Sequence, residues 1–247
     1  MKTYRAELHV HTVLSPCAEV EMIPPFIVQE ALERGITLLA ITDHNSTANI
    51  PAVIKAASGS ALTILAGMEL QTREEVHVLC LFDHYEQVQV LQDLVNHHLP
   101  PIKNDPEHFG EQFIVDETGD FLGREERLLL TSTDLTFEEA FSHVENLGGL
   151  FIPAHVNRKA FGLLYNLGFV PADLPIQALE ISRQVQPEEA LKSFPQIRGY
   201  PLIRSGDVHR LEEFLGVNEF ILEAPTLSEI RLALRGEAGR SLTLLHS

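Results

Sequence analysis

The most constraining feature of this sequence is the alternation of short apolar runs, rich in leucine and β-branched residues, with longer amphipathic segments. This order is typical of repeated strand–helix units around a parallel sheet. At 247 residues with a 45% hydrophobic share, the chain can form one α/β barrel with a substantial core. We expect strands at Ala6–Val10, Thr37–Thr42, Leu62–Met68, Val76–Phe82, Gly149–Ala154, Gln177–Ile181, Pro201–Ser205 and Glu219–Leu222.

Two amphipathic segments carry the start and stop signals of helices. Pro24–Arg34 opens with prolines suited to a first helical turn and stops before Gly35. Thr136–Leu147 starts with a potential N-cap threonine, and Glu139 three residues later can close a capping box. Gly148 then follows the predicted C-terminus. Both segments are therefore predicted to be helices.

The stretch from His97 to Asp134 breaks the strand–helix rhythm. Two short runs, Gln112–Val115 and Phe121–Leu130, flank the turn-forming segment Asp116–Asp120, which predicts a β-hairpin. We expect this hairpin to be an insertion, at about residues 97–134, in a single domain that covers residues 1–247. The insertion could act as a lid over one mouth of the sheet, or it could pack at its side or at a dimer contact.

The charge balance limits the partners of this chain. Eighteen lysines and arginines against 35 aspartates and glutamates give a net charge of −17, which makes binding of long nucleic acid unlikely. Small anionic substrates remain compatible with locally placed cations. Cys17 and Cys80 cannot form a disulfide scaffold, and the sequence shows neither a signal peptide nor a membrane span. We therefore expect a cytoplasmic protein that does not contact a membrane.

Histidines and carboxylates gather at the ends of the predicted strands, which meet on the active-site face of a parallel barrel. Burying so many polar groups together would be costly without cations to coordinate. Mixed imidazole and carboxylate ligands suit manganese, zinc or iron, and their number predicts two or three divalent ions. The alternative is a set of unrelated core histidines and capping aspartates. The residues are His9, His11, Asp43, His44, Glu69, His77, His155, Glu180, Asp207 and His209.

The other six histidines do not follow this pattern and are interpreted as solvated or locally capping. They are His84, His97, His98, His108, His143 and His246.

The strand-end motifs together resemble those of the polymerase and histidinol phosphatase (PHP) superfamily of metal-dependent phosphoesterases. They appear in family order as His9-Val10-His11-Thr12, Ile41-Thr42-Asp43-His44, Gly67-Met68-Glu69, Glu75-Val76-His77, Pro153-Ala154-His155 and Ser205-Gly206-Asp207-Val208-His209. The resemblance implies an α/β fold, a distorted (β/α)7 TIM-like barrel, with a trinuclear metal site. It also implies that His9, His11, Glu69 and Asp207 bind one metal, that Glu69 bridges to a second held by His77 and His155, and that His44 and His209 serve the third.

One part of the chain departs from the family pattern. The family usually has a further aspartate or histidine ligand in the turn after the first motif, where this chain reads Ser15-Pro16-Cys17-Ala18-Glu19. Either Cys17 as a thiolate or Glu19 could take that position, and a thiolate would favour zinc or iron over manganese. Cys17 could equally be a small buried thiol. Asp43 is expected to orient ligands rather than to bind metal.

The expected chemistry is hydrolysis of a phosphate ester by a metal-bound hydroxide. We predict catalytic roles for Asp207 and His209, with His209 or a metal-bound water as the proton donor to the leaving group. Arg158 and Arg183 are the preferred phosphate clamps among four arginines near strand ends, the others being Arg204 and Arg210. Ion pairing at the surface is the alternative role for each of them.

These features predict a phosphatase or phosphodiesterase that acts on a small phosphorylated metabolite or a nucleotide. A non-catalytic metal-binding barrel or binding subunit is one alternative, because structural metals also require ligands. A metal-dependent amidohydrolase is another, but it would normally need a carboxylated lysine, and no lysine lies at these strand ends.

Overall fold

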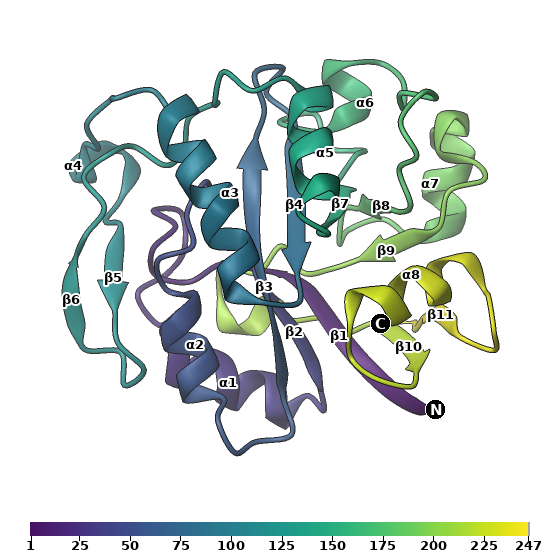
Figure 1. Cartoon of the computed structure of the whole chain (residues 1–247), viewed down its shortest axis with the longest axis horizontal. Helices are drawn as coiled ribbons and strands as arrows, with labels where there is room; N and C mark the ends of the chain where they lie inside the picture. Colours follow the sequence, from purple (N-terminus) through teal and green to yellow (C-terminus); the bar gives the residue numbers. More distant parts are fainter. Residues whose placement is uncertain (247) are drawn as a thin grey trace.

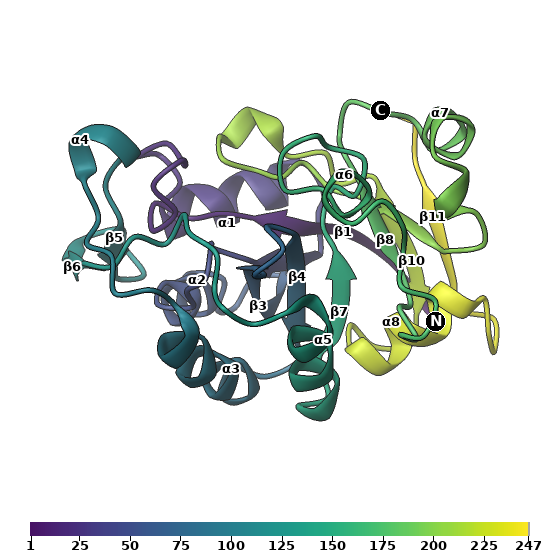
Figure 2. The ribbon, with the colours of Figure 1, turned by 90° about the horizontal axis from the view of Figure 1, so that it is seen from above.

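The computed structural model, which describes residues 1–246, is built around a mixed, curled sheet (Figures 1 and 2). Its strands are β1 (Lys2–Val10), β2 (Leu38–Ile41), β3 (Thr63–Gln71), β4 (His77–Phe82), β7 (Leu150–Pro153), β10 (Asn218–Leu222) and β11 (Ser241–Leu244). They lie in the order β11-β10-β1-β2-β3-β4-β7. Two further pairs stand beside this sheet, β5 (Phe113–Val115) with β6 (Phe121–Arg124), and β8 (Leu179–Ile181) with β9 (Leu202–Arg204).

Helices cover the outside of the curl, and α2, α3 and α5 lie in a row along one side (Figure 2). The α-helices are α1 (Pro24–Glu33), α2 (Ile50–Ala56), α3 (Tyr85–His98), α4 (Pro106–Phe109), α5 (Phe137–Asn146), α6 (Leu163–Asn166), α7 (Pro187–Ser193) and α8 (Leu227–Arg235), with 3-10 turns η1 (Pro195–Ile197) and η2 (Leu211–Glu213).

The two helices predicted from their end signals are confirmed. The first, α1, has proline in its first turn and ends beside Gly35. The second, α5, has Thr136 as its N-cap, and both hydrogen bonds of the predicted capping box to Glu139 are present. The apolar faces of these helices pack on the sheet, where Ile27 of α1 and Val144 of α5 are fully buried.

The sheet is mixed, whereas the strand–helix rhythm predicts a parallel one. The three strands β1, β2 and β3 are parallel, but β4 runs antiparallel to both of its neighbours, β3 and β7. The reason is local, because the turn Thr72–Val76 between β3 and β4 is too short for a crossover helix. The antiparallel pairing sets His77, at the start of β4, directly opposite Gln71 at the end of β3. His77 therefore lies at the same mouth as the carboxyl ends of the parallel strands.

The β8–β9 pair extends the curl toward β1. Residues after β9 form a parallel bridge with the end of β1, in which His11 N donates to Val208 O at 2.9 Å and Val208 N donates to His9 O at 3.0 Å. This arrangement is a curled α/β half-barrel, and it confirms the predicted fold class.

The segment from about residue 97 to 134 contains the end of α3, the short helix α4 and the antiparallel β5–β6 hairpin, which projects at the edge of the molecule (Figure 2). Two buried asparagines after β2 connect this segment to the barrel. Asn45 Nδ2 donates to the carbonyl oxygens of Leu129 and Thr131 at 2.8 and 2.9 Å. Asn49 donates to Phe113 O at 3.0 Å and accepts from Val115 N at 3.0 Å. The hairpin is thus anchored by buried hydrogen bonds.

Among the described residues, no helix is long and apolar enough to cross a membrane. The cytoplasmic location remains a prediction.

Candidate metal centre

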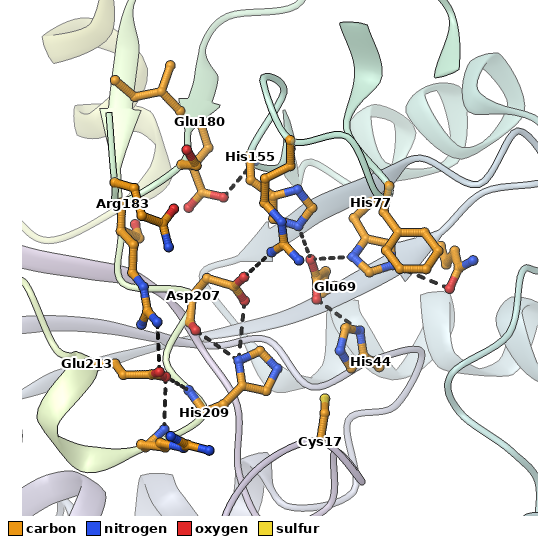
Figure 3. Close-up of a pocket in the computed structure, with 18 of the residues that line it drawn as sticks. Cys17, His44, Glu69, His77, His155, Glu180, Arg183, Asp207, His209 and Glu213 are labelled. Atoms are coloured by element: carbon orange, nitrogen blue, oxygen red, sulfur yellow. Dashed lines mark hydrogen bonds and ion pairs between the residues drawn. The ribbon is translucent and has the colours of Figure 1, made fainter. Parts of the chain in front are cut away.

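Six histidines and two carboxylates, contributed by most strands of the barrel, form one cluster. Four of the histidines and both carboxylates line a cavity of about 640 Å³, and His9 and His11 lie buried next to it. Figure 3 shows His44, His77 and His155 around Glu69, with Asp207 and His209 beside them. Except for Asp207 and His209, which are partly accessible, these side chains are buried. A buried group of this kind needs positive charge to compensate its carboxylates.

Glu69, at the end region of β3, is the centre of the cluster. Its Oε1 lies 2.8 Å from His77 Nδ1 and 3.1 Å from His155 Nε2. Its Oε2 lies 2.9 Å from His44 Nδ1. The Nε2 atoms of His9 and His11 approach the same carboxylate at 3.2 and 3.3 Å. One carboxylate is therefore shared by five imidazoles, which is the arrangement of a bridging ligand.

Three groups of ligand atoms within the described chain are close enough to hold an ion. They are His9, His11, Glu69 and Asp207; His44, Glu69 and His77; and His11, His44 and His209. Glu69 belongs to two of these groups, so its carboxylate can join two ions. The grouping differs from the one implied by the family resemblance, because His44 and not His155 joins Glu69 and His77 in the second group. Among the described residues His155 belongs to none of the three groups, although its Nε2 lies 3.1 Å from Glu69 Oε1.

The protonation pattern of the first two histidines fits metal ligation. His9 Nδ1 donates to Glu180 Oε2 at 2.9 Å, and His11 Nδ1 donates to Ser15 Oγ at 3.0 Å. These bonds leave both Nε2 atoms to face the cluster. Within residues 1–246, both Nε2 atoms, Glu69 Oε2 and His155 Nδ1 are buried and make no hydrogen bond of suitable geometry, although charged atoms lie near most of them. Buried polar atoms without partners are costly, and divalent ions would satisfy them.

The pKa shifts within the cluster also favour metal binding. Burial opposes a charge on His11, but Asp207 and Glu69 outweigh it and raise its pKa to about 9. Burial likewise opposes charge on Glu69, yet the surrounding histidines hold its pKa well below the usual range. Without metal, protons on the imidazoles thus supply the positive charge that the carboxylates require. Bound ions would replace those protons.

Two other imidazoles remain neutral. Burial, together with the neighbouring His11, lowers the pKa of His44 to about 4 and that of His209 to about 3. A neutral imidazole offers a lone pair, so both side chains are in the form that binds metal.

Asp43 is expected from the sequence to orient ligands, and it lies next to the cluster, hydrogen-bonded to residues that contact His11. It accepts hydrogen bonds at 2.7 Å from Thr12 N, Thr12 Oγ1 and Ser15 Oγ. Because Ser15 Oγ also accepts from His11 Nδ1, Asp43 orients His11 through Ser15. Asp43 belongs to none of the three groups of candidate ligands found among the described residues.

Glu180 has a similar supporting position. Its Oε2 accepts from His9 Nδ1 and, at 3.0 Å, from the backbone N–H of His155. One carboxylate from β8 thus positions two candidate ligands from β1 and the loop after β7.

Glu7 is a fully buried carboxylate beneath the cavity. Its oxygens accept from the backbone N–H groups of Gly206, Leu215 and Gly216 at 2.8–2.9 Å. Burial raises the pKa of Glu7 to about 7, although these three hydrogen bonds act in the opposite direction. Since Gly206 precedes Asp207, Glu7 helps to position the loop that carries Asp207 and His209.

Three cavity residues have left-handed backbone conformations. The φ angles are 30° at His155, 50° at Asp207 and 60° at Phe161. Such conformations are uncommon outside glycine, and they cluster at functional sites where the surrounding structure can impose them. Two candidate ligands and one aromatic side chain are therefore held in conformations that local sequence does not favour.

The two alternatives for the ligand after the first motif have different positions. Cys17 lines the cavity, and its sulfur points toward the space between His44 and His209 (Figure 3). Glu19 is absent from the described residues that line the cavity and instead pairs with Arg210 Nε at 2.8 Å. Its exposed carboxylate gains more from this neighbouring cation and from water than from a buried position. Cys17, unlike Glu19, therefore lines the cavity. Its side chain is exposed, so the alternative of a small buried thiol is wrong, and it belongs to none of the three ligand groups found among the described residues.

The predicted clamps Arg158 and Arg183 both line the cavity. Arg158 Nη1 lies 2.5 Å from Asp207 Oδ2, and Arg183 donates to Gly206 O at 3.1 Å and to Glu213 Oε1 at 2.8 Å. By contrast, Arg204 is buried within β9 and lies outside this cavity. Arg210 also lines the cavity, so three guanidinium groups face it.

Sequence reasoning missed two residues of the site. Glu213 accepts from the backbone N–H of His209 at 2.8 Å and pairs with Arg183. Phe161 stacks on His77, with ring centroids 4.4 Å apart and an interplanar angle of 3°. No motif marks either one, although the glycine after Phe161 signals a turn.

Residues 7–156 match the model of the PHP domain family. The chain belongs to the PHP domain family. This finding confirms the resemblance seen in the sequence, and with it membership of the metal-dependent phosphoesterase superfamily. Hydrolysis of phosphate ester bonds is the reaction class that this family membership supports.

Two curated relatives match this PHP chain. The "5'-3' exoribonuclease Rnm" of Salmonella typhimurium is 38% identical over 80 residues, which are 30% of this chain and 26% of that protein. The "Uncharacterized protein YqxK" of Bacillus subtilis is 24% identical over 98% of this chain and 64% of that protein. The chain thus spans less than two thirds of the length of either relative.

A similar solved structure is that of the lesion-specific endonuclease PfuEndoQ from Pyrococcus furiosus. It has a TM-score of 0.76 at 20% identity, over 98% of this chain and 58% of that chain. At this level of identity, the similarity establishes a shared fold.

Proposed function

We propose that this chain hydrolyses the phosphate ester of a small phosphorylated metabolite or a nucleotide, at a site that holds two or three divalent metal ions. The observation that carries the proposal is the buried cluster around Glu69, in which five imidazoles share one carboxylate. Buried atoms without partners at His9, His11 and Glu69 favour occupation by metal. Family membership supplies the reaction class.

Manganese, zinc or iron suits this ligand set better than calcium or magnesium, because imidazole nitrogens predominate. When bound, such ions polarise a phosphoryl oxygen and lower the pKa of water. We propose His9, His11, His44, Glu69, His77, His155, Asp207 and His209 as the ligands. Cys17 is proposed as an additional ligand beside His44 and His209, and a thiolate there would favour zinc or iron.

Two of the three arginines that line the cavity, Arg158 and Arg183, are proposed to bind the phosphate. Arg158 is held by Asp207 and Arg183 by Glu213, so both guanidinium groups are oriented before substrate arrives. A guanidinium group forms paired, charge-assisted hydrogen bonds with phosphate oxygens and stabilises the charge that develops during transfer. His209 lies at the accessible edge of the cluster, and its neutral imidazole is proposed as a metal ligand rather than as the proton donor.

The proposed substrate is small, no larger than the end of a short oligonucleotide. Two similar proteins are named as nucleases, an exoribonuclease and a lesion-specific endonuclease. The net charge of −17 disfavours a long polyanion, whereas a cavity of about 640 Å³ can accommodate one nucleotide. We therefore propose a free phosphorylated metabolite, a nucleotide or the end of a short oligonucleotide as substrate.

The decisive experiment is hydrolysis of an aryl phosphomonoester and of the matching diester by protein loaded with manganese, zinc or iron. Asp207→Asn should lose turnover because it removes an oxygen ligand and a partner of Arg158. Asp173→Asn, at an exposed loop position, is the matched control and should keep it. The ratio of monoester to diester rates assigns the chain as phosphatase or phosphodiesterase. Turnover retained in Asp207→Asn would contradict the assignment of the Glu69 cluster as the catalytic site.

A further inference from the structure

One short loop, residues 155–162, presents three different chemical groups to the metal cavity. His155 belongs to the cluster around Glu69, Arg158 pairs with Asp207, and Phe161 stacks on His77. All three side chains line the same cavity. The loop is compact, because a Cβ atom at Gly162 would lie 2.2 Å from the carbonyl oxygen of Arg158. The close approach of the Gly162 and Arg158 backbones therefore fixes the shape of the loop.

Phe161 is held in this loop at a conformational cost. Its φ angle of 60° is unusual for a large aromatic residue, and its carbonyl oxygen accepts a hydrogen bond at 3.0 Å from the backbone N–H of His77. One face of its ring lies parallel to the buried His77 ring, while the half-buried side chain still lines the cavity. The ring thus presents apolar surface to the space beside the metal cluster. In Figure 3, His77 is on the opposite side of the cluster from Arg183.

A planar aromatic group is the ligand that such a wall accommodates best. Its flat face would continue the stack that already joins His77 and Phe161, and base–aromatic stacking is favourable for every nucleobase. A second observation points to a hydroxyl on the same ligand. Glu180 lines the cavity, and its Oε1 is buried without a hydrogen-bond partner among residues 1–246. A sugar hydroxyl could donate to this oxygen.

Resting on the proposed phosphoesterase function, we propose that Phe161 is a specificity residue that stacks on the base of a nucleotide whose phosphate binds at the metal centre. The loop would then position phosphate and base together, through Arg158 and Phe161. This assignment selects nucleotides over aliphatic phosphoesters among the substrates compatible with the site.

Binding of two matched ligands to metal-loaded, full-length protein tests this proposal. They are the phosphonate analogues of adenosine 5′-monophosphate and of ribose 5-phosphate, in which a methylene group replaces the ester oxygen so that neither can be hydrolysed. The two ligands share the ribose and the phosphonate and differ at C1′, which carries the base in one and a hydroxyl group in the other. Titration calorimetry should show that the wild-type protein binds the adenosine analogue about tenfold more tightly than the ribose analogue.

The variant Phe161→Asn removes the ring, and asparagine tolerates the left-handed conformation, so the loop should keep its shape. We expect it to abolish most of the tenfold preference while its metal content stays unchanged. Phe161→Tyr should retain the preference, because it keeps the ring. Phe169→Asn is the matched control, since Phe169 is exposed and absent from the described lining of the cavity.

Three results would overturn the proposal. They are equal affinity of the wild-type protein for the two ligands, an unchanged preference in Phe161→Asn, and an equal loss of affinity for both ligands in that variant. The last result would show that Phe161 only supports His77. Because the ligands are not hydrolysed, this outcome is independent of aryl phosphate turnover. Turnover without a base preference would refute the role of Phe161 alone, whereas a base preference without turnover would refute the proposed hydrolysis.

Discussion

Asp43 shows how the metal centre depends on a residue outside the candidate ligand set. Its carboxylate accepts three hydrogen bonds at 2.7 Å and is fully buried. Ser15, one of the donors, also contacts His11. The orientation of His11 is thus determined two side chains away from it, by a group that carries no metal itself.

We predict that Asp43→Asn lowers metal affinity about 10- to 100-fold, because His11 loses its fixed orientation. The new amide would also bring a donor toward Thr12, at a cost of about 2 kcal/mol in the free energy of unfolding. Metal titration and denaturant unfolding measure the two effects. Asp173→Asn, the exposed control, should change neither. Unaltered metal affinity in Asp43→Asn would contradict the orienting role.

At the scale of secondary-structure elements, the predicted capping box of α5 makes the helix sensitive to pH. Glu139 Oε2 accepts from Thr136 N at 2.9 Å, and hydrogen bonds from Thr136 lower the pKa of Glu139. A carboxyl group with a lowered folded-state pKa stabilises the protein above its unfolded pKa, and that contribution is lost as pH falls through the folded value.

We therefore expect Glu139→Gln to be less stable than the wild-type protein at pH 7 and nearly equal to it at pH 3. Denaturant unfolding at the two pH values measures the difference. Glu138→Gln, on the same first turn but outside the capping box, is the control. A difference that grows toward low pH would have the wrong sign for a cap.

The attachment of the inserted β5–β6 hairpin to the barrel involves one side chain in particular, that of Asn49. Asn49 bonds both Phe113 and Val115 of β5, so it joins the hairpin to the barrel. Replacing it with alanine leaves the buried N–H of Val115 without its acceptor. We expect Asn49→Ala to increase amide hydrogen exchange in residues 113–124 while exchange in β1–β3 stays the same. Equal protection in both proteins would show that the hairpin is held by other contacts.

At the scale of the whole molecule, the metal centre is expected to stabilise the barrel. Its candidate ligands come from β1, β3 and β4 and from the loops after β2, β7 and β9, so bound ions would cross-link segments far apart in sequence. Ions that bind the folded chain alone raise its stability by about 1.4 kcal/mol for each tenfold excess over the dissociation constant.

We predict that a chelator lowers the melting temperature of metal-loaded protein, and that manganese, zinc or iron restores it more fully than calcium. Asp207→Asn should show a smaller shift, because it lacks one ligand, and Asp173→Asn should behave like wild type. Calorimetry with and without chelator makes this measurement. A melting temperature independent of metal would argue against a cross-linking centre.

Much of this protein could be predicted from sequence because the relevant signals are local. Apolar runs predicted the strands, and end signals predicted α1 and α5, since both depend on neighbouring residues. The motifs that contain His11, His44 and Asp207 identified the family and the class of ligand. The strands, the two helices and the ligand class could be predicted from residue type and position along the chain alone, because none of them depends on how distant segments pack.

Other features depended on contacts that only the tertiary structure creates. The short turn after β3 reverses β4, which brings His77 to the cavity by an antiparallel path. His9 and Glu180 lie 171 residues apart in sequence, yet they share a hydrogen bond. Glu19 faces Arg210 instead of the metal cluster, and Phe161 is placed on His77 by a strained loop. The sequence by itself thus determined the fold class and the kind of metal chemistry, because both follow from local pattern and residue type. Only the folded chain decided which side chains support the candidate ligands and which of them line the cavity, because these properties arise between distant segments.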